Sequence, residues 1–409
     1  MTRSFPQGFL WGTSSAAHQV EGDNRNNDWW EWEQQPGHIF GGEKSGAAND
    51  HYHRFREDFA LLRELNQSAH RLSIEWSRVE PAEGEFDAAQ IEHYRDVLRA
   101  LHEVQITPMV TLHHFSSPRW FVAKGGWTSR DAHVAFIPFV ERVVDELGEM
   151  VPLWCTINEP SIYAANGWIT GDFPPGHHGD LPSQYRVGAA MWRAHELAYA
   201  AIKKRRPESS VGLSHHKFLF MPASSRFWNR LATAAAQLVT DRWAVRRRGL
   251  RRVVEASSDY IGIAHYWGQL AAFDLRRPQD QFVRRFNPPG VQLTDMGWAS
   301  SPSWMRDVLN ELKPYGKPVY VTENGIAATD DRVRERYLTD ILANVHAAIG
   351  DGVDVRGYFH WTNTDNFEWA RGYSAKFGLI DVDRQTLART VKPSGRLYGR
   401  IAAANALPD

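Results

Sequence analysis

The sequence predicts an α/β protein that folds as a single (β/α)8 barrel, the architecture also called a TIM barrel. Eight short segments are β-branched or apolar and are bounded by turn or charge signals, which is typical of strands. Amphipathic helical stretches lie between most of them. A strand and a helix repeated eight times indicate a closed parallel barrel.

The expected strands share an apolar middle, and most of them end in polar residues. Several are nearly continuous apolar runs, as parallel strands covered on both faces tend to be. They are expected at residues 8–15, 68–76, 107–114, 153–159, 210–216, 259–266, 317–324 and 355–361. The C-terminal ends of the strands build the active site in this fold. The candidate site is therefore at the polar ends, which are His113, His114, Asn158, Glu159, His215, His216, Tyr266, Glu323, Asn324 and Trp361.

The intervening segments have the 3.6-residue period of helices that cover a sheet. Residues 54–65 place Phe55, Phe59, Leu62 and Leu65 on one face. The same kind of pattern predicts helices at residues 91–104, 131–147, 185–206, 303–313 and 331–349.

The domain organisation follows from length and from missing motifs. A chain of 409 residues would ordinarily suggest two or three domains, but one barrel can reach this size. No low-complexity linker interrupts the chain, so we expect one domain over residues 1–409. A doubly wound open sheet is the rival fold. It is disfavoured because the sequence contains neither of the glycine-rich phosphate-binding motifs.

Composition narrows the classes of partner. The net charge of −1 gives no reason to expect binding to nucleic acid or to an anionic membrane. With Cys155 as the single cysteine, no intramolecular disulfide can form. The first residues have no signal-peptide pattern, and no apolar run is long enough to span a membrane, so a cytoplasmic location is expected. The sequence leaves the oligomeric state open.

Two glutamates close expected strands on nearly opposite sides of the barrel. Glu159 ends the fourth strand within residues 156–160, and Glu323 ends the seventh within residues 321–325. Two carboxylates facing each other are what glycosidic cleavage requires. A separation of about 5–5.5 Å predicts retention of the anomeric configuration and about 6.5–9.5 Å predicts inversion. The alternative is that either residue is only a structural ion-pair partner.

The chain resembles glycoside hydrolase family 1 over essentially its whole length. The pair of motifs Thr-Ile-Asn-Glu-Pro and Val-Thr-Glu-Asn-Gly, together with Asn-Phe-Glu-Trp, is a very specific combination. The matching stretches are residues 9–22, 50–65, 71–81, 111–118, 156–160, 294–298, 319–325 and 357–380.

The resemblance implies a retaining hydrolysis and a role for individual residues. By their motifs, Glu159 is the general acid/base and Glu323 is the nucleophile. Asn158 matches the residue that hydrogen-bonds the sugar 2-hydroxyl, and Arg71 and Tyr266 match residues that hold the nucleophile. Residues that grip the non-reducing sugar, or line its pocket, match Gln19, His114, Trp361, Glu368, Trp369 and Phe377.

The physical requirements agree with these roles. The nucleophile must stay ionised, and Arg71 is expected to lower the pKa of Glu323. Glu159 must be protonated when the first bond breaks and ionised when water attacks. No cofactor is expected.

Glu368 is the residue that carries most information on the sugar. A carboxylate there can accept hydrogen bonds from two adjacent hydroxyls and would repel a phosphate. We therefore expect a neutral glycoside or oligosaccharide as substrate, glucosides first, with galactosides or fucosides tolerated. The alternatives are a sugar-binding pseudoenzyme on the same barrel and a 6-phospho-β-glycosidase.

Tryptophan is abundant, with 17 residues, and its rings stack on sugars as readily as they fill cores. Trp168 and Trp298 are candidates to line the aglycone side. The sequence also departs from the family at Phe115, where the family carries tryptophan, which predicts a roomier base of the sugar pocket.

Histidine pairs raise the alternative of a metal-dependent hydrolase. A catalytic metal needs three convergent ligands and an open position. His51 and His53 precede a helix rather than ending the first strand, so they cannot complete such a site. No metal is expected.

Overall fold

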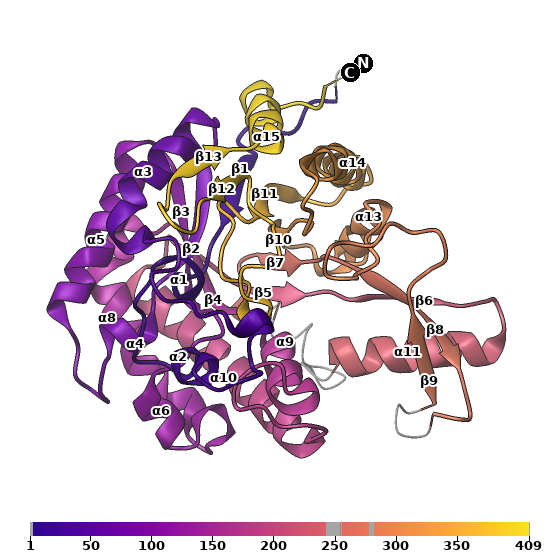
Figure 1. The fold of residues 1–409 in the computed structure, drawn as a ribbon, viewed down its shortest axis with the longest axis horizontal. Coiled ribbons are helices and arrows are strands. Elements are labelled where there is room, and N and C mark those ends of the chain that lie inside the picture. The colour runs from indigo at the N-terminus through magenta and orange to yellow at the C-terminus, as the bar shows by residue number, and fades with distance from the viewer. Residues whose placement is uncertain (1–2, 243–253, 255, 278–281, 409) are drawn as a thin grey trace.

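The protein is described by a computed structural model that covers residues 3–242, 254, 256–277 and 282–408. Eight parallel strands close into a barrel in the order β1-β11-β10-β7-β5-β4-β3-β2 (Figure 1). They are β1 Leu10–Ser14, β2 Ala69–Ser73, β3 Thr107–His113, β4 Leu153–Asn158, β5 Ser210–His216, β7 Ile261–Ala264, β10 Val319–Asn324 and β11 Val355–Trp361. Each lies within one of the eight expected segments, so the predicted barrel is confirmed.

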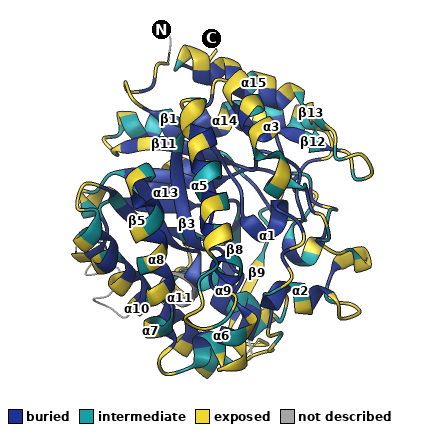
Figure 2. Cartoon of the chain, turned by 90° about the vertical axis from the view of Figure 1, so that its left-hand side faces the viewer, coloured by how far each residue is buried: buried dark blue, intermediate teal, exposed yellow. Residues whose placement is uncertain are grey.

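The predicted helices surround the barrel. Each buries an apolar face, and some have a side chain that caps the first turn: Asp87 accepts from the amides of Ala89 and Gln90 at the start of α5. The long helices are α3 His51–Glu64, α5 Ala88–Glu103, α8 Ile137–Leu147, α10 Leu181–Arg205, α13 Ser303–Asn310, α14 Asp331–Gly350 and α15 Pro393–Ala404. In Figure 2, α5 lies in front of β3 with exposed residues on its outer face.

Short helices and a two-stranded sheet complete the loops around the barrel. The helices are α1 Ala17–Val20, α2 Asp28–Glu33, α4 Trp76–Val79, α6 Arg119–Ala123, α7 Ala132–Ala135 and α9 Pro160–Ala165. The strands β12 Ile380–Val382 and β13 Arg389–Val391 pair antiparallel. Most of these elements follow the C-terminal ends of strands and so shape the candidate site.

The two ends of the barrel differ in chemistry. One layer inside the barrel is apolar and consists of Ala69, Met109, Leu153, Tyr260, Tyr320 and Phe359. Gly12 faces this layer because a Cβ there would lie 2.7 Å from the Phe359 ring. The opposite, C-terminal ends carry buried polar residues such as Asn158 and Glu323. The apolar layer therefore fills one end of the barrel, and the polar side chains that could take part in a reaction gather at the C-terminal end.

One substructure lies outside the predicted pattern. The strands β6 Leu219–Pro222, β8 Gly268–Phe273 and β9 Val283–Phe286 form a separate sheet, against which α11 Phe227–Arg242 packs (Figure 1). We call this sheet and helix the side module. β6 follows β5 after two residues and β8 follows β7 after three, at positions where the sequence predicted no strand. The expectation of one domain over the whole chain stays a prediction.

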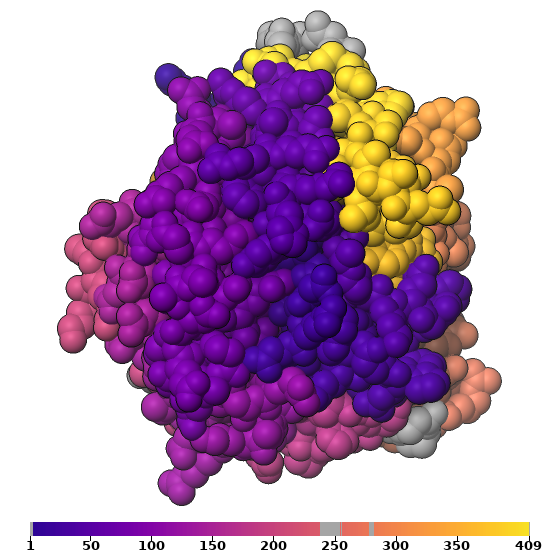
Figure 3. Space-filling model, turned by 60° about the vertical axis from the view of Figure 1, so that its left-hand side comes forward, coloured from indigo at the N-terminus to yellow at the C-terminus, as the bar shows by residue number. Residues whose placement is uncertain are grey.

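The first and last described segments meet at the barrel. The amide of Phe5 donates to the carbonyl of Asn405 at 2.9 Å, and β1 pairs with both β2 and β11. Figure 3 shows the C-terminal segment packed against the N-terminal part of the chain. Within the described ranges, none of the helices combines the length and the apolar character needed to cross a membrane.

Candidate active site

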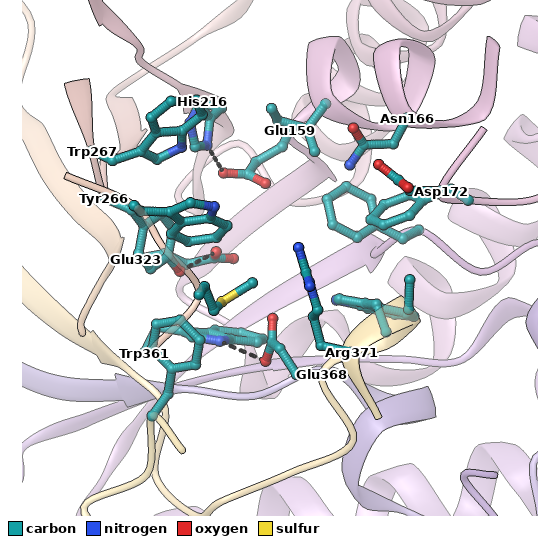
Figure 4. Close-up of a pocket in the computed structure, with 18 of the residues that line it drawn as sticks. Glu159, Asn166, Asp172, His216, Tyr266, Trp267, Glu323, Trp361, Glu368 and Arg371 are labelled. Carbon is teal, nitrogen blue, oxygen red and sulfur yellow. Dashed lines mark hydrogen bonds and ion pairs between the residues drawn. The ribbon is translucent and has the colours of Figure 1, made fainter. Parts of the chain in front are cut away.

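A cavity of about 540 Å³ opens at the C-terminal ends of the barrel strands. Glu159, His216, Tyr266, Glu323 and Trp361 reach it from β4, β5, β7, β10 and β11 or from the residue or two that follow each strand. Figure 4 shows Glu159 and Glu323 pointing into this one cavity. The structure therefore brings together the two carboxyl groups that the sequence singled out.

Irregular backbone aims both carboxyl groups. Glu159 has a φ of 40°, in the left-handed region that residues other than glycine rarely adopt, and Pro160 begins α9 immediately after it. The pairing of β10 with β7 shifts register between Val321 and Glu323. Such irregularities redirect side chains at the rims of barrels.

Two donors hold the carboxylate of Glu323. Arg71 Nη1 donates to Oε1, and the Tyr266 hydroxyl donates to Oε2 at 3.0 Å. The second arm of the guanidinium, Nη2, donates to Asn158 Oδ1 at 2.7 Å. All four side chains are buried. Both oxygens of Glu323 are thus fixed in one orientation.

The ionisation of Glu323 reflects a competition between burial and its donors. Burial raises its pKa to about 7, with the charge of Glu159 adding to the rise, while Arg71 and Tyr266 pull the pKa down. The sequence predicted the direction of the arginine's effect. It did not predict the net direction, because it could not show how completely the site is shielded from water.

The carboxyl of Glu159 has a different partner. His216 Nδ1 lies 2.6 Å from Glu159 Oε1, and this is the one hydrogen bond that the described residues make to that carboxyl. His216 was placed at the candidate site by the sequence, but no role was predicted for it. The available signal was the polar end of the fifth strand, which contained His215 and His216 without a role for either.

Glu368, which the sequence predicted to bind the sugar, lines the cavity. Its Oε2 accepts from Trp361 Nε1 and Gln19 Nε2, both at 3.3 Å. Burial raises the pKa of Glu368 to about 8. Gln19 Oε1 is buried and has no hydrogen-bond partner among the described residues. An unpaired buried acceptor beside a carboxyl suits a ligand that brings hydroxyl groups.

His114 lines the same cavity as Glu368 and is a neutral imidazole. Burial lowers its pKa well below the usual range. Asn158 Nδ2 donates to its Nε2 at 3.1 Å, and its ring stacks on Trp361 with centroids 5.6 Å apart. A neutral imidazole in this position can exchange hydrogen bonds with a sugar hydroxyl without adding charge.

The structure places most of the other predicted residues at the site. The residues that line the cavity directly are His114, Glu159, Tyr266, Trp298, Glu323, Trp361, Glu368, Trp369 and Phe377. Gln19, Arg71 and Asn158 lie behind them and are fully buried. Phe115 also lines the cavity, with its ring 5.4 Å from that of Trp369.

Trp168 requires a correction. It does not line the cavity, since only 4% of it is exposed and its ring packs against those of Tyr163 and His177. Its role is packing. Trp298 does line the cavity, and Trp267, which the sequence analysis did not select, stacks on it at 6.0 Å.

His51 and His53 lie outside the cavity and have carboxylate partners, with His53 Nδ1 2.7 Å from Asp50 Oδ1. His51 Nδ1 lies 2.6 Å from Asp58 Oδ2 on α3. Over the described ranges, no three side chains of His, Cys, Asp or Glu converge as a metal-binding group. The expectation of a metal-free site stays a prediction.

Comparisons with known proteins agree with the geometry. The model of the family described as "Glycosyl hydrolase family 1" matches residues 1–249 and 245–407. β-Glucosidase A of Acetivibrio thermocellus is 30% identical, covering 98% of this chain and 99% of its own. The bifunctional β-D-glucosidase/β-D-fucosidase of Bifidobacterium breve is also 30% identical, covering 98% of this chain and 99% of its own. The solved β-glycosidase from Pyrococcus horikoshii superposes with a TM-score of 0.92 at 34% identity, covering 100% of this chain and 97% of its own.

Proposed function

The chain belongs to glycosyl hydrolase family 1, and we propose that it is an exo-acting retaining β-glucosidase that releases single neutral sugars from β-glycosides. The observation that carries this proposal is the placement of Glu323, held by Arg71 and Tyr266, in one cavity with Glu159. Fucosides are further candidate substrates, since the relative from B. breve is named for both glucosides and fucosides. Galactosides are a candidate on the sequence resemblance alone.

The first step forms a covalent intermediate. The Glu323 carboxylate attacks the anomeric carbon while Glu159 gives its proton to the glycosidic oxygen. The bond from the anomeric carbon to the leaving oxygen breaks, and a bond from that carbon to Glu323 forms. Arg71 and Tyr266 orient the attacking oxygens, since each oxygen of Glu323 has its own donor.

The second step reverses these roles. Glu159, now ionised, accepts a proton from a water molecule that attacks the anomeric carbon, and Glu323 departs as a carboxylate. Two inversions give net retention. Both steps use the same two side chains, so the enzyme returns to its starting protonation state after each turnover.

The side chains that line the cavity support a neutral sugar, because carboxyl groups outnumber cations there. Glu159, Asp172, Glu323 and Glu368 line it, and among the described lining residues Arg371 is the only lysine or arginine. Arg371 is exposed. A phosphorylated sugar would lack a buried cation to balance it, which disfavours a 6-phospho-β-glycosidase. Half-buried Phe218, Trp267 and Trp298 offer flat surfaces to an aglycone.

Replacing the nucleophile tests the proposal. For Glu323→Gly we expect a loss of turnover on aryl β-glucosides by about 10⁴-fold or more, because no covalent intermediate can form. Added azide should then yield an α-glycosyl azide, which NMR identifies. The matched control is Glu208→Gly in an exposed turn, which should behave as the unchanged enzyme. Near-normal turnover by Glu323→Gly would refute the nucleophile role, whereas no turnover by the unchanged protein would leave the sugar-binding pseudoenzyme as the better explanation.

The remaining features of the proposal rest on the sequence. We propose that the enzyme acts in the cytoplasm, as one domain, on a small glycoside and without metal or other cofactor. With Cys155 as the single cysteine no intramolecular disulfide is possible, so the chain needs no oxidising compartment.

A further inference from the structure

We propose that His216 positions the acid/base: as a neutral imidazole with its proton on Nδ1, it holds Glu159 Oε1 so that Oε2 presents the catalytic proton to the glycosidic oxygen. This inference rests on the proposed function. It adds a residue that touches Glu159 and acts through it.

The contact is short and enclosed. His216 Nδ1 and Glu159 Oε1 are 2.6 Å apart, and the two side chains are 5% and 6% exposed. Figure 4 shows the imidazole directed at the carboxyl, while the other oxygen faces the open part of the cavity. One oxygen is therefore committed to the histidine and the other is available to the substrate.

Neighbouring rings fix the orientation of the imidazole. Its centroid lies 4.3 Å from that of Phe218, and it stacks at 6.1 Å on Tyr266, which itself donates to Glu323. His216 follows Ser214 by two residues on β5, so both side chains are on the same face. Ser214 stands opposite Asn158 in the register of β4 with β5. The strand pairing thus sets the histidine beside the acid.

The second ring nitrogen indicates which form the histidine takes. His216 Nε2 is buried and finds no hydrogen-bond partner among the described residues. An unpaired donor on a cationic ring would be far more costly there than an unpaired acceptor on a neutral ring. The proton therefore belongs on Nδ1, where Glu159 accepts it.

The other titratable groups around the ring leave Glu159 as its partner. The Tyr266 hydroxyl donates to Glu323, and Lys217 Nζ pairs with Glu311 Oε2 at 2.9 Å. His265 is turned to the carbonyl of Lys217, with Nδ1 at 2.7 Å, and burial lowers its pKa to about 4.

The proposed hydrogen bond between His216 and Glu159 requires no additional proton transfer. In the first step the proton passes from Glu159 Oε2 to the leaving oxygen as the glycosidic bond breaks and the bond to Glu323 forms. The Nδ1 proton stays on His216, and its hydrogen bond strengthens because the acceptor becomes a carboxylate. A neutral donor stabilises that carboxylate modestly. A cation would stabilise it so strongly that Glu159 would give up its proton before substrate binds.

The test compares leaving groups. A 2,4-dinitrophenyl β-glucoside departs without protonation, whereas a phenyl β-glucoside needs the acid. For His216→Leu we expect the ratio of kcat/KM between these substrates to rise by about 30-fold in favour of the dinitrophenyl glucoside, a fraction of the roughly 10²–10⁴-fold that general acids contribute. A merely structural role would lower both values together and leave the ratio unchanged.

Two matched variants locate the effect on Nδ1. The amide nitrogen of His216→Asn falls near the position of Nδ1, so the ratio of kcat/KM between the two substrates should stay close to that of the unchanged enzyme. The amide of His216→Gln falls near Nε2 instead, so it should behave as His216→Leu does. Gln also preserves polarity and size, which keeps the test open if the leucine variant does not fold. Equal behaviour of Asn and Gln would overturn the proposal.

A parallel variant separates failure of this inference from failure of the proposed function. Glu159→Ala should raise the same ratio by about 10²-fold or more. If Glu159→Ala leaves the ratio unchanged, the acid/base role itself is wrong. If Glu159→Ala raises the ratio and both His216→Leu and His216→Gln leave it unchanged, the role of Glu159 stands and that of His216 is overturned.

Discussion

The two carboxyl groups that are proposed to carry out the reaction are held in opposite ways. Glu323 is gripped on both oxygens, by the cation of Arg71 and the hydroxyl of Tyr266, whereas Glu159 is held on one oxygen by one imidazole. A nucleophile attacks as an anion and benefits from a fixed charge beside it. An acid/base must lose and regain a proton in every turnover, so it needs a partner that orients it without committing its charge.

The barrel supplies these two environments from different strands. Arg71 lies on β2, across the barrel, and its second arm reaches Asn158 beside the acid. His216 comes from β5, which is the direct neighbour of β4. The long arginine therefore connects the two sides of the site, while the histidine acts only on its own side.

Of the changes that test this contrast, removing the positive charge of Arg71 should have the largest effect. For Arg71→Met we expect kcat/KM to fall by about 10³-fold, the upper range for deleting one preorganised donor. The fall should be equal for 2,4-dinitrophenyl and phenyl β-glucosides, since both need the nucleophile. Steady-state kinetics on the two substrates measures it.

Arg71→Lys is the matched control, because it keeps the charge but lacks the two-armed geometry. It should lie between the unchanged enzyme and Arg71→Met. A loss in Arg71→Met that depends strongly on the leaving group would break the contrast, because the arginine would then act through the acid.

Glu368 should respond to the sugar rather than to the leaving group. For Glu368→Ser we expect about 10²-fold lower kcat/KM on glucosides, since each buried sugar hydroxyl left without its hydrogen-bond partner costs roughly 1–3 kcal/mol. A series of deoxyglucosides measures the specificity: substrates that lack the matching hydroxyls should lose much less. Equal losses across the series would count against a sugar contact.

The pH profile should show the smallest effect. Glu323 must be ionised to attack, and burial raises its pKa to about 7. The ionised fraction therefore falls as pH falls through 7, and kcat/KM should drop about tenfold for each further pH unit. The 2,4-dinitrophenyl β-glucoside isolates this limb, because it does not need Glu159 as acid. A midpoint near 4.5 would show instead that Arg71 outweighs burial.

The barrel could be predicted well from the sequence because its strands are buried on both faces. Several are nearly continuous apolar runs and most end in polar residues, so position and direction are both visible. Glu159 and Glu323 stood out for the same reason. The side module was missed because β6 has only four residues and follows β5 after two residues, which leaves little signal for a separate strand.

The site was less predictable where contacts decide a role. The sequence gives no reason to prefer Trp168 or Trp298 as the residue that lines the aglycone side. Only the packing in the structure shows that Trp168 is buried against Tyr163. His216 needed the register of β5 against β4, which places it beside Glu159. The raised pKa of Glu323 needed the degree of burial, which no local pattern reports.

The left-handed backbone conformation of Glu159 directs its side chain into the cavity but lowers the stability of the folded chain. A residue with a Cβ held at a φ of 40° destabilises the folded chain by about 1–3 kcal/mol relative to a relaxed conformation. Glycine would remove that strain together with the carboxyl group. The side chain at this position therefore lowers the stability of the folded chain and makes the proposed reaction possible, and a variant chosen for heat resistance alone would tend to lack it.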